Sequence, residues 1–342
     1  METTQLKGIG VASRIALGTW AIGGWMWGGT TDEDESIRTI HAALDQGITV
    51  LDTAPVYGFG RSEEIVGKAI VRRGERNRII IATKVGLEYQ EGYILRNSTP
   101  ARIAVEIEDS LRRLQTDYID LYQIHWPDPL VNCEETAAVM NSLYLAGKIR
   151  AIGVSNYSPE GMEAFQQAAP LVSCQPPYNL FERRIEQGVI PYCKEHQIAL
   201  LTYSALCRGL LSGRMNLATQ FEGDDVRKID PKFRQPRFNK YLDAVKRLDR
   251  FAHERHGKSV MHLAVRWILD QGADIAICGA RHPEQLAYIS EVTGWTLTAD
   301  DKKEIDLILW ETVTKPVGPA FMAPLIRQSA DEQGNLYRAA TN

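Results

Sequence analysis

The stretch LDTAPVYGFGRSEE, residues 51–64, holds the end of one expected element, a loop and the start of the next. The β-branched and apolar residues that lead into it, Ile48 to Leu51, predict a buried strand. The run from Ser62 to Val71 predicts a helix. Between them the chain places a carboxylate, Asp52, at the end of the strand and a phenol, Tyr57, in the loop. The stretch is therefore one strand–loop–helix unit with polar side chains after the strand.

The same unit recurs along the chain. We predict eight strands, at Ile15–Trp20, Thr49–Leu51, Arg78–Thr83, Tyr118–Ile124, Ile149–Val154, Val172–Cys174, Ile198–Thr202 and Asp274–Cys278. Helical runs separate them, including Thr31–Gln46, Glu134–Ala146, Glu186–His196 and two that begin at Thr99-Pro100 and Ser158-Pro159. Such alternation is typical of a parallel sheet with crossover helices. Eight units favour a closed (β/α)8 TIM barrel over a doubly wound sheet, and we expect residues 1–342 to form a single domain.

Bulk composition limits the function classes. The 342 residues are 44% hydrophobic and 24% charged, with a net charge of −4. The chain lacks the excess of lysine and arginine that is typical of nucleic-acid-binding proteins. No apolar run reaches the roughly 18 residues of a membrane span. The first residues lack the apolar core of a signal peptide, and the five cysteines have no disulfide or zinc spacing. We therefore expect a cytoplasmic protein with no metal site and no obligate protein partner.

Three titratable residues follow consecutive predicted strands at the same relative place. Asp52, Lys84 and His125 stand at strand ends, and Tyr57 lies on the loop after the first of them. A lone Lys or His there is usually a solvated loop residue, but side chains at the carboxyl ends of adjacent barrel strands converge. We expect Asp52 to keep Lys84 charged and Lys84 to lower the pKa of Tyr57. A neutral His125 could donate a hydrogen bond to a carbonyl oxygen.

This group can protonate a carbonyl oxygen while a nucleophile attacks the carbon. The pattern contains no serine or cysteine nucleophile, so the attacking group must be brought in. A hydride from a nicotinamide cofactor is the natural candidate.

Six segments carry a family resemblance. They are LDTAPVYGFGRSEE, ATK (82–84), LYQIHWPD (121–128), IRAIGVSNY (149–157), TYSALCRGLLSGR (202–214) and GARHPEQL (279–286). These segments occur in the order typical of the aldo-keto reductase superfamily, which the chain resembles from Ile15 to about Trp310. Within the superfamily, the chain most resembles the bacterial branch acting on small carbonyls and polyols. The resemblance implies a (β/α)8 barrel and an NAD(P)H-dependent carbonyl reductase or alcohol (polyol) dehydrogenase. It assigns the catalytic roles to Asp52, Tyr57, Lys84 and His125, with Tyr57 as proton donor.

The resemblance also implies a cofactor site. Its residues would be Trp20, Ser155, Asn156, Gln175, Tyr203, Ser204, Leu206, Arg208, Gly209, Leu211, Gly279, Ala280, Arg281 and Gln285. Arg281, ahead of a helix expected to open at Pro283, is placed to hold a 2′-phosphate, so NADP(H) is favoured over NAD(H). Family members often have an acid and an asparagine where Tyr288 and Ile289 stand, so NAD(H) use stays open. Trp27 and Trp126 are candidate substrate walls beside Tyr57 and His125.

Two other functions compete with this interpretation. Some barrels of the superfamily resemble channel-associated β subunits, in which the cofactor serves sensing and turnover is low, and a turnover assay separates the two. A metal-dependent hydrolase would need a pair of histidines closing the first strand, where Gly18 to Trp20 stand instead. We also predict that the irregular stretch Ser204–Asn239 is a lid over the cofactor, and that Lys315–Asn342 is a polar tail.

Overall fold

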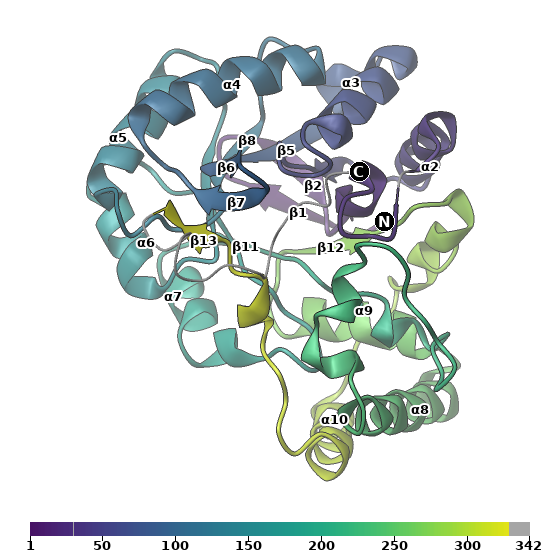
Figure 1. Cartoon of the computed structure of the whole chain (residues 1–342). Coiled ribbons are helices and arrows are strands. Elements are labelled where there is room, and N and C mark those ends of the chain that lie inside the picture. Colours follow the sequence, from purple (N-terminus) through teal and green to yellow (C-terminus); the bar gives the residue numbers. More distant parts are fainter. Residues whose placement is uncertain (30, 328–342) are drawn as a thin grey trace.

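The computed structural model describes residues 1–29 and 31–327, and in it eight parallel strands close into a barrel (Figure 1). The strands are β3 (Ile15–Gly18), β4 (Val50–Asp52), β5 (Ile80–Val85), β8 (Leu121–Ile124), β9 (Ile152–Ser155), β10 (Ser173–Gln175), β11 (Ala199–Thr202) and β12 (Ile275–Gly279). Each pairs with the next barrel strand, and β12 pairs with β3 to complete the ring. The predicted (β/α)8 fold is confirmed, and every predicted strand overlaps an observed one.

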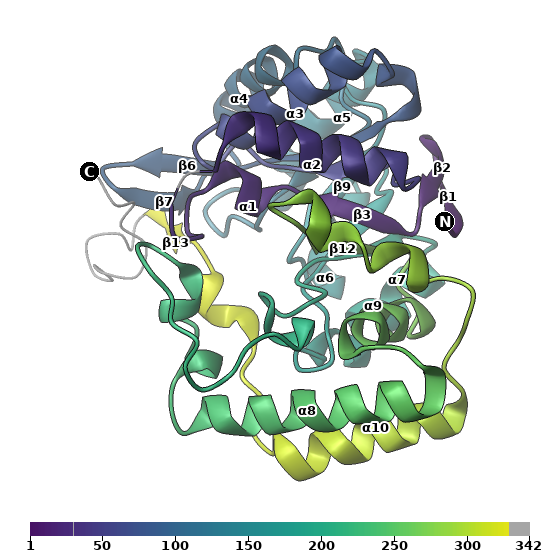
Figure 2. The ribbon, with the colours of Figure 1, turned by 90° about the vertical axis from the view of Figure 1, so that its right-hand side faces the viewer.

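Helices cover the outside of the barrel. They are α2 (Glu33–Asp45), α3 (Arg61–Arg73), α4 (Pro100–Leu114), α5 (Cys133–Leu145), α6 (Pro159–Gln166), α7 (Val189–Glu195), α8 (Arg237–His256), α9 (Val260–Asp270) and α10 (Ala299–Thr312). The side chains of Thr99 and Ser158 accept hydrogen bonds from the first turns of α4 and α6, as their positions before a proline predict. Helices α8 and α10 lie side by side along one edge of the molecule (Figure 2).

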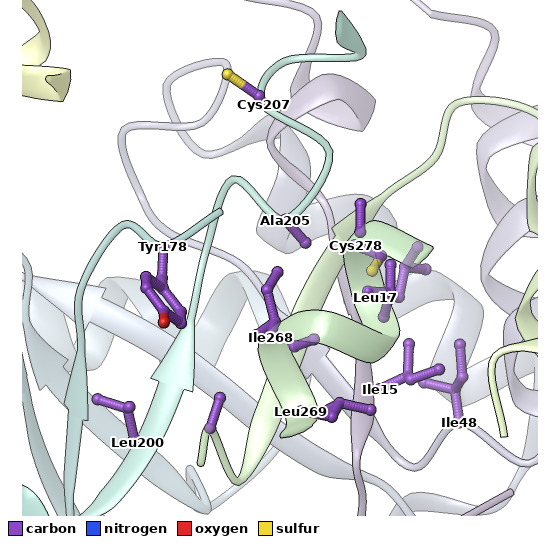
Figure 3. Close-up of a cluster of buried hydrophobic side chains, with 14 of the residues drawn as sticks. Ile15, Leu17, Ile48, Tyr178, Leu200, Ala205, Cys207, Ile268, Leu269 and Cys278 are labelled. Carbon is purple, nitrogen blue, oxygen red and sulfur yellow. The ribbon is translucent and has the colours of Figure 1, made fainter. Parts of the chain in front are cut away.

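The apolar residues form two layers because side chains alternate along each strand. On β3, Ala16 faces the barrel interior, whereas Ile15 and Leu17 belong to the layer between strands and helices. Figure 3 shows part of that outer layer, in which Ile268 and Leu269 of α9 lie beside the strand residues. Both faces of each strand are thus buried, which explains why the strands appear in the sequence as continuous apolar runs.

Two β-hairpins add to the barrel, and the sequence analysis predicted neither. Strands β1 (Thr3–Leu6) and β2 (Gly10–Ser13) pair at one end, where Leu6 and Ala12 join the interior layer. Strands β6 (Leu87–Gln90) and β7 (Tyr93–Arg96) form the second hairpin, and β13 (Leu325–Ile326) pairs with β7. Figure 2 shows the two hairpins on opposite sides of the molecule. The second one follows β5, so it stands over the carboxyl ends of the strands.

The segment after β11 is long and irregular, as predicted, and α8 ends it at Arg237. It contains three short 3-10 turns: η3 (Leu210–Ser212), η4 (Val226–Lys228) and η5 (Pro231–Phe233). A buried ion cluster fixes it: Arg208 Nε lies 2.7 Å from Asp230 Oδ2, and Lys232 Nζ lies 2.7 Å from Glu182 Oε1. Arg208 also pairs with Glu182. The segment is therefore held by buried ion pairs, both within itself and to Glu182 in the loop after β10.

The C-terminal tail is only partly described. From Lys315 onward the structure places the 3-10 turn η8 (Pro319–Met322) and β13. Residues 328–342, which belong to the predicted tail, lie outside the described residues. Across residues 1–29 and 31–327, the helices are too short or too polar for any of them to span a membrane.

Candidate active site

The four residues assigned to catalysis lie together at the mouth of the barrel. Lys84 Nζ is 2.6 Å from Asp52 Oδ1 and 3.3 Å from the phenol oxygen of Tyr57. The His125 ring meets the Tyr57 ring edge-on, with centroids 5.8 Å apart. The ends of the adjacent strands β4, β5 and β8 supply Asp52, Lys84 and His125, so the barrel geometry itself sets their spacing.

The loop that carries Tyr57 is fixed against the segment after β3. A Cβ atom at Gly58, where φ is +66°, would lie 2.2 Å from the carbonyl oxygen of Gly23, so only glycine fits there. The amide of Ser62 donates to the carbonyl of Tyr57 at 3.1 Å. The Ser62 hydroxyl also lies 2.9 Å from the hydroxyl of Thr53. The first turn of α3 thereby positions the phenol relative to the strand ends.

Burial dominates the protonation of these groups. Removal from water raises the pKa of Tyr57 well above 10, and the charge of Asp52 adds to the rise. Burial also lowers the pKa of Lys84, an effect that Asp52 opposes, and it lowers the pKa of His125 well below 6.5, with Lys84 contributing. The expectation that Lys84 lowers the pKa of Tyr57 is therefore wrong in this structure. The reason is burial, which raises the pKa of Tyr57 most, together with the charge of Asp52, which lies 2.6 Å from the ammonium.

Asp52 has a second partner. Its Oδ2 accepts a hydrogen bond from the side-chain amide of Gln175 at 2.7 Å, and the same amide lies 3.3 Å from Gln123 Oε1. Gln175 was predicted to contact the cofactor, and the structure gives its nitrogen the additional task of holding the carboxylate. Asp52 is thus a buried anion with a cation on one oxygen and an amide on the other, which satisfies a charge that would otherwise be costly.

Asn156 connects the tetrad to the opposite side of the mouth. Its Oδ1 accepts from the Tyr203 hydroxyl at 2.8 Å, and its Nδ2 donates to the carbonyl of His125 at 3.0 Å. Asn156 has a positive φ of 62°, a conformation that asparagine tolerates better than most residues. Ser155 Oγ donates to the carbonyl of Gln175 at 2.7 Å. These predicted cofactor residues form one hydrogen-bonded wall beside the tetrad.

Two cavities meet at the tetrad, sharing Trp20, Tyr57 and Tyr203. The smaller, of about 90 Å³, we call the inner pocket. Its other lining residues are Trp25, Met26, Val56, Leu87, Ile94, His125, Trp126, Ser155, Asn156, Gln175, Val226, Met322 and Pro324. The larger, of about 500 Å³, we call the long cleft, and it extends from Asp52 and Tyr57 to Arg281 and Gln285. A small reactant and an elongated ligand could therefore meet at Tyr57.

Most of the predicted cofactor residues line one of the two cavities. Ser204, Leu206, Gly209, Gly279 and Ala280 line the long cleft, as does Arg208, whose guanidinium is engaged by the buried ion cluster described above. Two side chains lie elsewhere than expected. Leu211 is fully buried in the core and lines neither cavity. Trp27, predicted as a substrate wall, lines the long cleft, whereas Trp126 lines the inner pocket.

The far end of the long cleft differs from the prediction. Pro283 opens only the four-residue 3-10 turn η6 (Pro283–Leu286), so there is no α-helix N-terminus at this place. Instead, the Gln285 side chain accepts from the amides of Arg281 at 2.7 Å and His282 at 3.4 Å, so these two amides are not free to bind a phosphate. Arg281 Nη1 donates to the carbonyl of Trp27 at 3.0 Å. The cation predicted at this end is present, whereas the helix is not.

The sequence analysis missed much of the wall of the inner pocket. Leu87 and Ile94 come from the β6–β7 hairpin, and Met322 and Pro324 come from the C-terminal segment. The hairpin has a weak signal in the sequence, because alternating residues flank a two-residue turn, Glu91-Gly92, in which both φ values are positive. The contact made by the C-terminal segment has no local signal.

Comparison with known proteins agrees with this geometry. The aldo/keto reductase family model matches residues 14–309. Aldo-keto reductase YhdN from Bacillus subtilis (strain 168) is 62% identical over 330 residues, covering 96% of this chain and 99% of that protein. The NADH-specific methylglyoxal reductase of Escherichia coli (strain K12) is 35% identical over 289 residues, covering 80% of this chain and 87% of that protein.

Solved structures give the same result. The glycerol dehydrogenase AKR11B4 from Gluconobacter oxydans superposes with a TM-score of 0.85 at 53% identity, covering 94% of this chain and 99% of that one. An aldo-keto reductase from Klebsiella pneumoniae in complex with NADPH superposes with a TM-score of 0.71 at 28% identity, covering 90% and 94%. The fold, the site at the mouth of the barrel and these matches together show that the chain belongs to the aldo/keto reductase family.

Proposed function

We propose that this chain is an NADP(H)-dependent oxidoreductase that interconverts small aldehydes or ketones with the corresponding alcohols or polyols. The observation that carries the proposal is the position of Tyr57. Its hydroxyl lies 3.3 Å from Lys84 Nζ, and its side chain lines both the inner pocket and the long cleft. Similarity to a glycerol dehydrogenase and to a reductase bound to NADPH supports the same function.

The residues of the long cleft fit a dinucleotide. Arg214, Arg227 and Arg281 line it, so it suits an anionic ligand. Arg281 Nε is buried and has no partner among the described residues, which leaves a donor for such a ligand. A nicotinamide bound with its ring near Tyr57 would supply a hydride to the carbonyl carbon.

The chain's own residues would then handle the proton. Tyr57, kept protonated by its raised pKa, gives its proton to the carbonyl oxygen. Lys84, 3.3 Å away, stabilises the phenolate that forms. His125, kept neutral by its lowered pKa, donates a hydrogen bond to the same carbonyl oxygen. In the reverse direction the phenolate accepts the alcohol proton.

Turnover separates an enzyme from a cofactor sensor. We expect measurable initial rates with NADPH for at least one member of a panel of small aldehydes, ketones and polyols. A protein that binds NADPH tightly but turns over no member of the panel would support the channel-β-subunit-like alternative instead.

Arg281 tests the choice of cofactor. Arg281→Ala is expected to weaken NADPH binding by about 1–3 kcal/mol, the scale of a hydrogen bond to a charged group, and to leave NADH binding nearly unchanged. The reason is that the two cofactors differ only by the 2′-phosphate. Titration of both cofactors against wild type and variant measures this difference. Arg250→Ala, at an exposed arginine of α8 that lines neither cavity, is the matched control and should change neither affinity. Equal losses for both cofactors, or a wild type that prefers NADH, would contradict the assignment.

The pKa of His125 predicts an acid sensitivity of the fold. Burial keeps the folded pKa well below 6.5, so as the pH falls below 6.5 the unfolded chain binds a proton that the native state does not. Stability contributed by neutral His125 is thus full above pH 6.5 and decreases below it, by on the order of 1 kcal/mol at pH 5.5. In His125→Gln this part of the loss should disappear. Urea unfolding of both proteins at pH 8 and pH 5.5 measures this loss. An equal decrease in unfolding free energy in the two proteins would contradict the lowered pKa of His125.

The lid interpretation of the segment after β11 is also testable. Arg214 and Lys228 are exposed on it, and both are trypsin sites. Because Met215, Thr219 and Phe221 line the long cleft, a bound cofactor should stabilise the segment and slow cleavage at these two sites several-fold. Limited proteolysis with and without NADPH measures the effect, and equal cleavage rates would argue against a lid.

A further inference from the structure

A fully buried carboxylate lies beside the strand that carries Lys84. Glu63 belongs to the first turn of α3, the helix that follows the Tyr57 loop. Thr83 Oγ1 donates to Glu63 Oε1 at 2.7 Å, and Arg113 Nε donates to Glu63 Oε2 at 2.7 Å. A carboxylate removed from water is costly unless its oxygens are satisfied, and here each oxygen has a donor, one of them charged. The fold therefore holds Glu63 as an anion between the barrel and its helices.

The two partners of Glu63 come from the elements around the reacting groups. Thr83 precedes Lys84 on β5, and because side chains alternate along a strand, its hydroxyl faces the helices while Lys84 points into the barrel mouth. Arg113 belongs to α4, and its Cδ would lie 2.8 Å from a Cβ atom at Gly60, the N-cap of α3. Figures 1 and 2 both show α3 and α4 side by side. Arg113 thus packs against the end of the loop that carries the phenol.

The residue before Glu63 makes contacts on the other side of the lysine. The amide of Ser62 donates to the carbonyl of Tyr57 at 3.1 Å, and its hydroxyl lies 2.9 Å from that of Thr53. The carbonyl of Thr53 accepts from Lys84 Nζ at 3.0 Å. One turn of α3 therefore contacts the Tyr57 loop through Ser62 and the strand of Lys84 through Glu63.

The groups around Glu63 keep it ionised at neutral and alkaline pH. Burial raises its pKa, and the guanidinium of Arg113 opposes that rise. A second buried carboxylate, Glu106 of α4, accepts from Arg102 Nε at 3.0 Å, and burial raises its pKa to about 7. Tyr122 of β8 also faces the two carboxylates, but burial raises its pKa well above 10, so it stays neutral. Of these groups, Glu63 is the anion paired directly with Arg113.

Lys84 lies within the field of this anion. Burial lowers the pKa of Lys84, and the charges of Asp52 and Glu63 both oppose that effect. Asp52 contacts the ammonium in the barrel mouth at 2.6 Å, whereas Glu63 acts from the helix side of β5. The ammonium is therefore stabilised by two buried carboxylates that belong to different layers of the fold.

From these contacts we propose that Glu63 is a positioning residue for proton transfer. Its carboxylate fixes the strand of Lys84 relative to the helix that follows Tyr57, and it supplies a second negative charge that keeps the lysine an ammonium. Glu63 lines neither the inner pocket nor the long cleft, so it acts through Lys84 and not on a bound molecule. This inference rests on the proposed carbonyl reduction and adds a residue to its machinery.

The pH profile of Glu63→Gln tests the proposal. Glutamine keeps the shape and an acceptor oxygen but carries no charge. In the wild type, kcat for glyceraldehyde reduction with NADPH should fall at alkaline pH as Lys84 loses its proton. We expect this alkaline limb to move to lower pH by roughly 0.5–1 unit in Glu63→Gln, with kcat at pH 6–7 within about threefold of wild type. A merely structural residue would lower kcat or stability at every pH. A limb that stays in place or moves to higher pH would overturn the inference, although carbonyl reduction would stand.

NMR of isotope-labelled lysine measures the same effect without turnover. The Lys84 Nζ signal, assigned by its absence in Lys84→Met, is titrated in wild type and in Glu63→Gln. We expect its midpoint to fall in Glu63→Gln in step with the alkaline limb, and an unchanged midpoint would contradict the role of Glu63. If the wild type reduces no carbonyl compound, the proposed function fails, while this titration still decides whether Glu63 acts on Lys84.

Two further variants separate the charge of Glu63 from its hydrogen bond and from burial in general. Thr83→Val removes the donor to Oε1 but leaves the charge, so its alkaline limb should lie within about 0.2 unit of wild type. Glu106→Gln is the matched control, because it neutralises the other buried carboxylate of the same interface, whereas the carboxylates that raise the pKa of Lys84 are Asp52 and Glu63. A shift in Glu106→Gln as large as that in Glu63→Gln would overturn the assignment.

A double variant keeps the test open if Glu63→Gln does not fold. The single change leaves Arg113 as a half-buried cation without its carboxylate, which is destabilising. Glu63→Gln/Arg113→Met removes both charges and should restore much of the lost stability. Because it still lacks the charge of Glu63, its alkaline limb should also lie at lower pH than that of wild type, and a wild-type limb in the folded double variant would refute the proposal.

Discussion

Tyr57→Phe is expected to lower kcat for carbonyl reduction by two to four orders of magnitude while cofactor affinity stays within about twofold of wild type. The variant removes one oxygen and keeps the ring. That ring stacks on Trp20, with centroids 5.9 Å apart, and meets His125 edge-on. The shape of both cavities should therefore survive. Lys84 loses one neighbour at 3.3 Å but retains Asp52 and the carbonyl of Thr53.

The raised pKa of Tyr57 makes this prediction specific. Because burial and Asp52 both disfavour the phenolate, the phenol holds its proton across the neutral range and can donate it only as negative charge develops on the substrate oxygen. No other described group next to the phenol is suited to replace it, since Lys84 is paired and His125 is already neutral.

Three measurements check the Tyr57 prediction. Initial rates give kcat, fluorescence titration gives the cofactor Kd, and thermal unfolding reports the fold. Tyr144→Phe, which removes the hydroxyl of an exposed tyrosine on α5, should match wild type in all three. A Tyr57→Phe enzyme with more than a tenth of wild-type kcat would remove Tyr57 from the proton-transfer step.

Local patterns predicted the barrel and the convergence of its strand ends. The runs that precede Asp52, Lys84 and His125 are continuously apolar because parallel strands are buried on both faces. Such runs therefore predict buried strands. Once eight of them close, side chains at their carboxyl ends must approach one another. The contact between Lys84 and Asp52 follows from pairing of adjacent strands, so it could be inferred without the structure.

Contacts between distant parts of the chain could not be inferred in this way. Strand β13 pairs with a hairpin more than two hundred residues earlier, so nothing near Met322 indicates that it lines the inner pocket. Arg208 was predicted to contact the cofactor because the family resemblance places it in the cofactor site. Its guanidinium instead pairs with Glu182 and Asp230, which follow different strands of the barrel. The pKa of Tyr57 was predicted in the wrong direction because the depth of burial depends on all the surrounding elements at once.

Lys84→Met is expected to lower kcat by about two to three orders of magnitude, because the phenolate that forms during proton transfer loses the neighbouring cation. The pH profile separates this role from a structural one. Burial lowers the pKa of Lys84, so in wild type the ammonium is lost, and the rate falls, as the pH rises through that lowered value. In Lys84→Met this alkaline limb should disappear, since the pKa of Tyr57 is raised and the phenol stays protonated.

Asp52→Asn provides the opposite test of the same pair. The charge of Asp52 raises the pKa of Lys84 against the effect of burial, so its removal should lower that pKa further and move the alkaline limb to lower pH. The loss of kcat at pH 6–7 should be milder than in Lys84→Met, because the ammonium keeps a polar neighbour. Among the described residues, Lys84→Met leaves the buried Asp52 carboxylate with only Gln175 as a hydrogen-bond partner, so the variant should also unfold at a lower temperature. The double variant Asp52→Asn/Lys84→Met should recover part of that stability without recovering activity. If Lys84→Met kept the wild-type rate and alkaline limb, or if Asp52→Asn moved the limb to higher pH, Lys84 and Asp52 would not act as a pair.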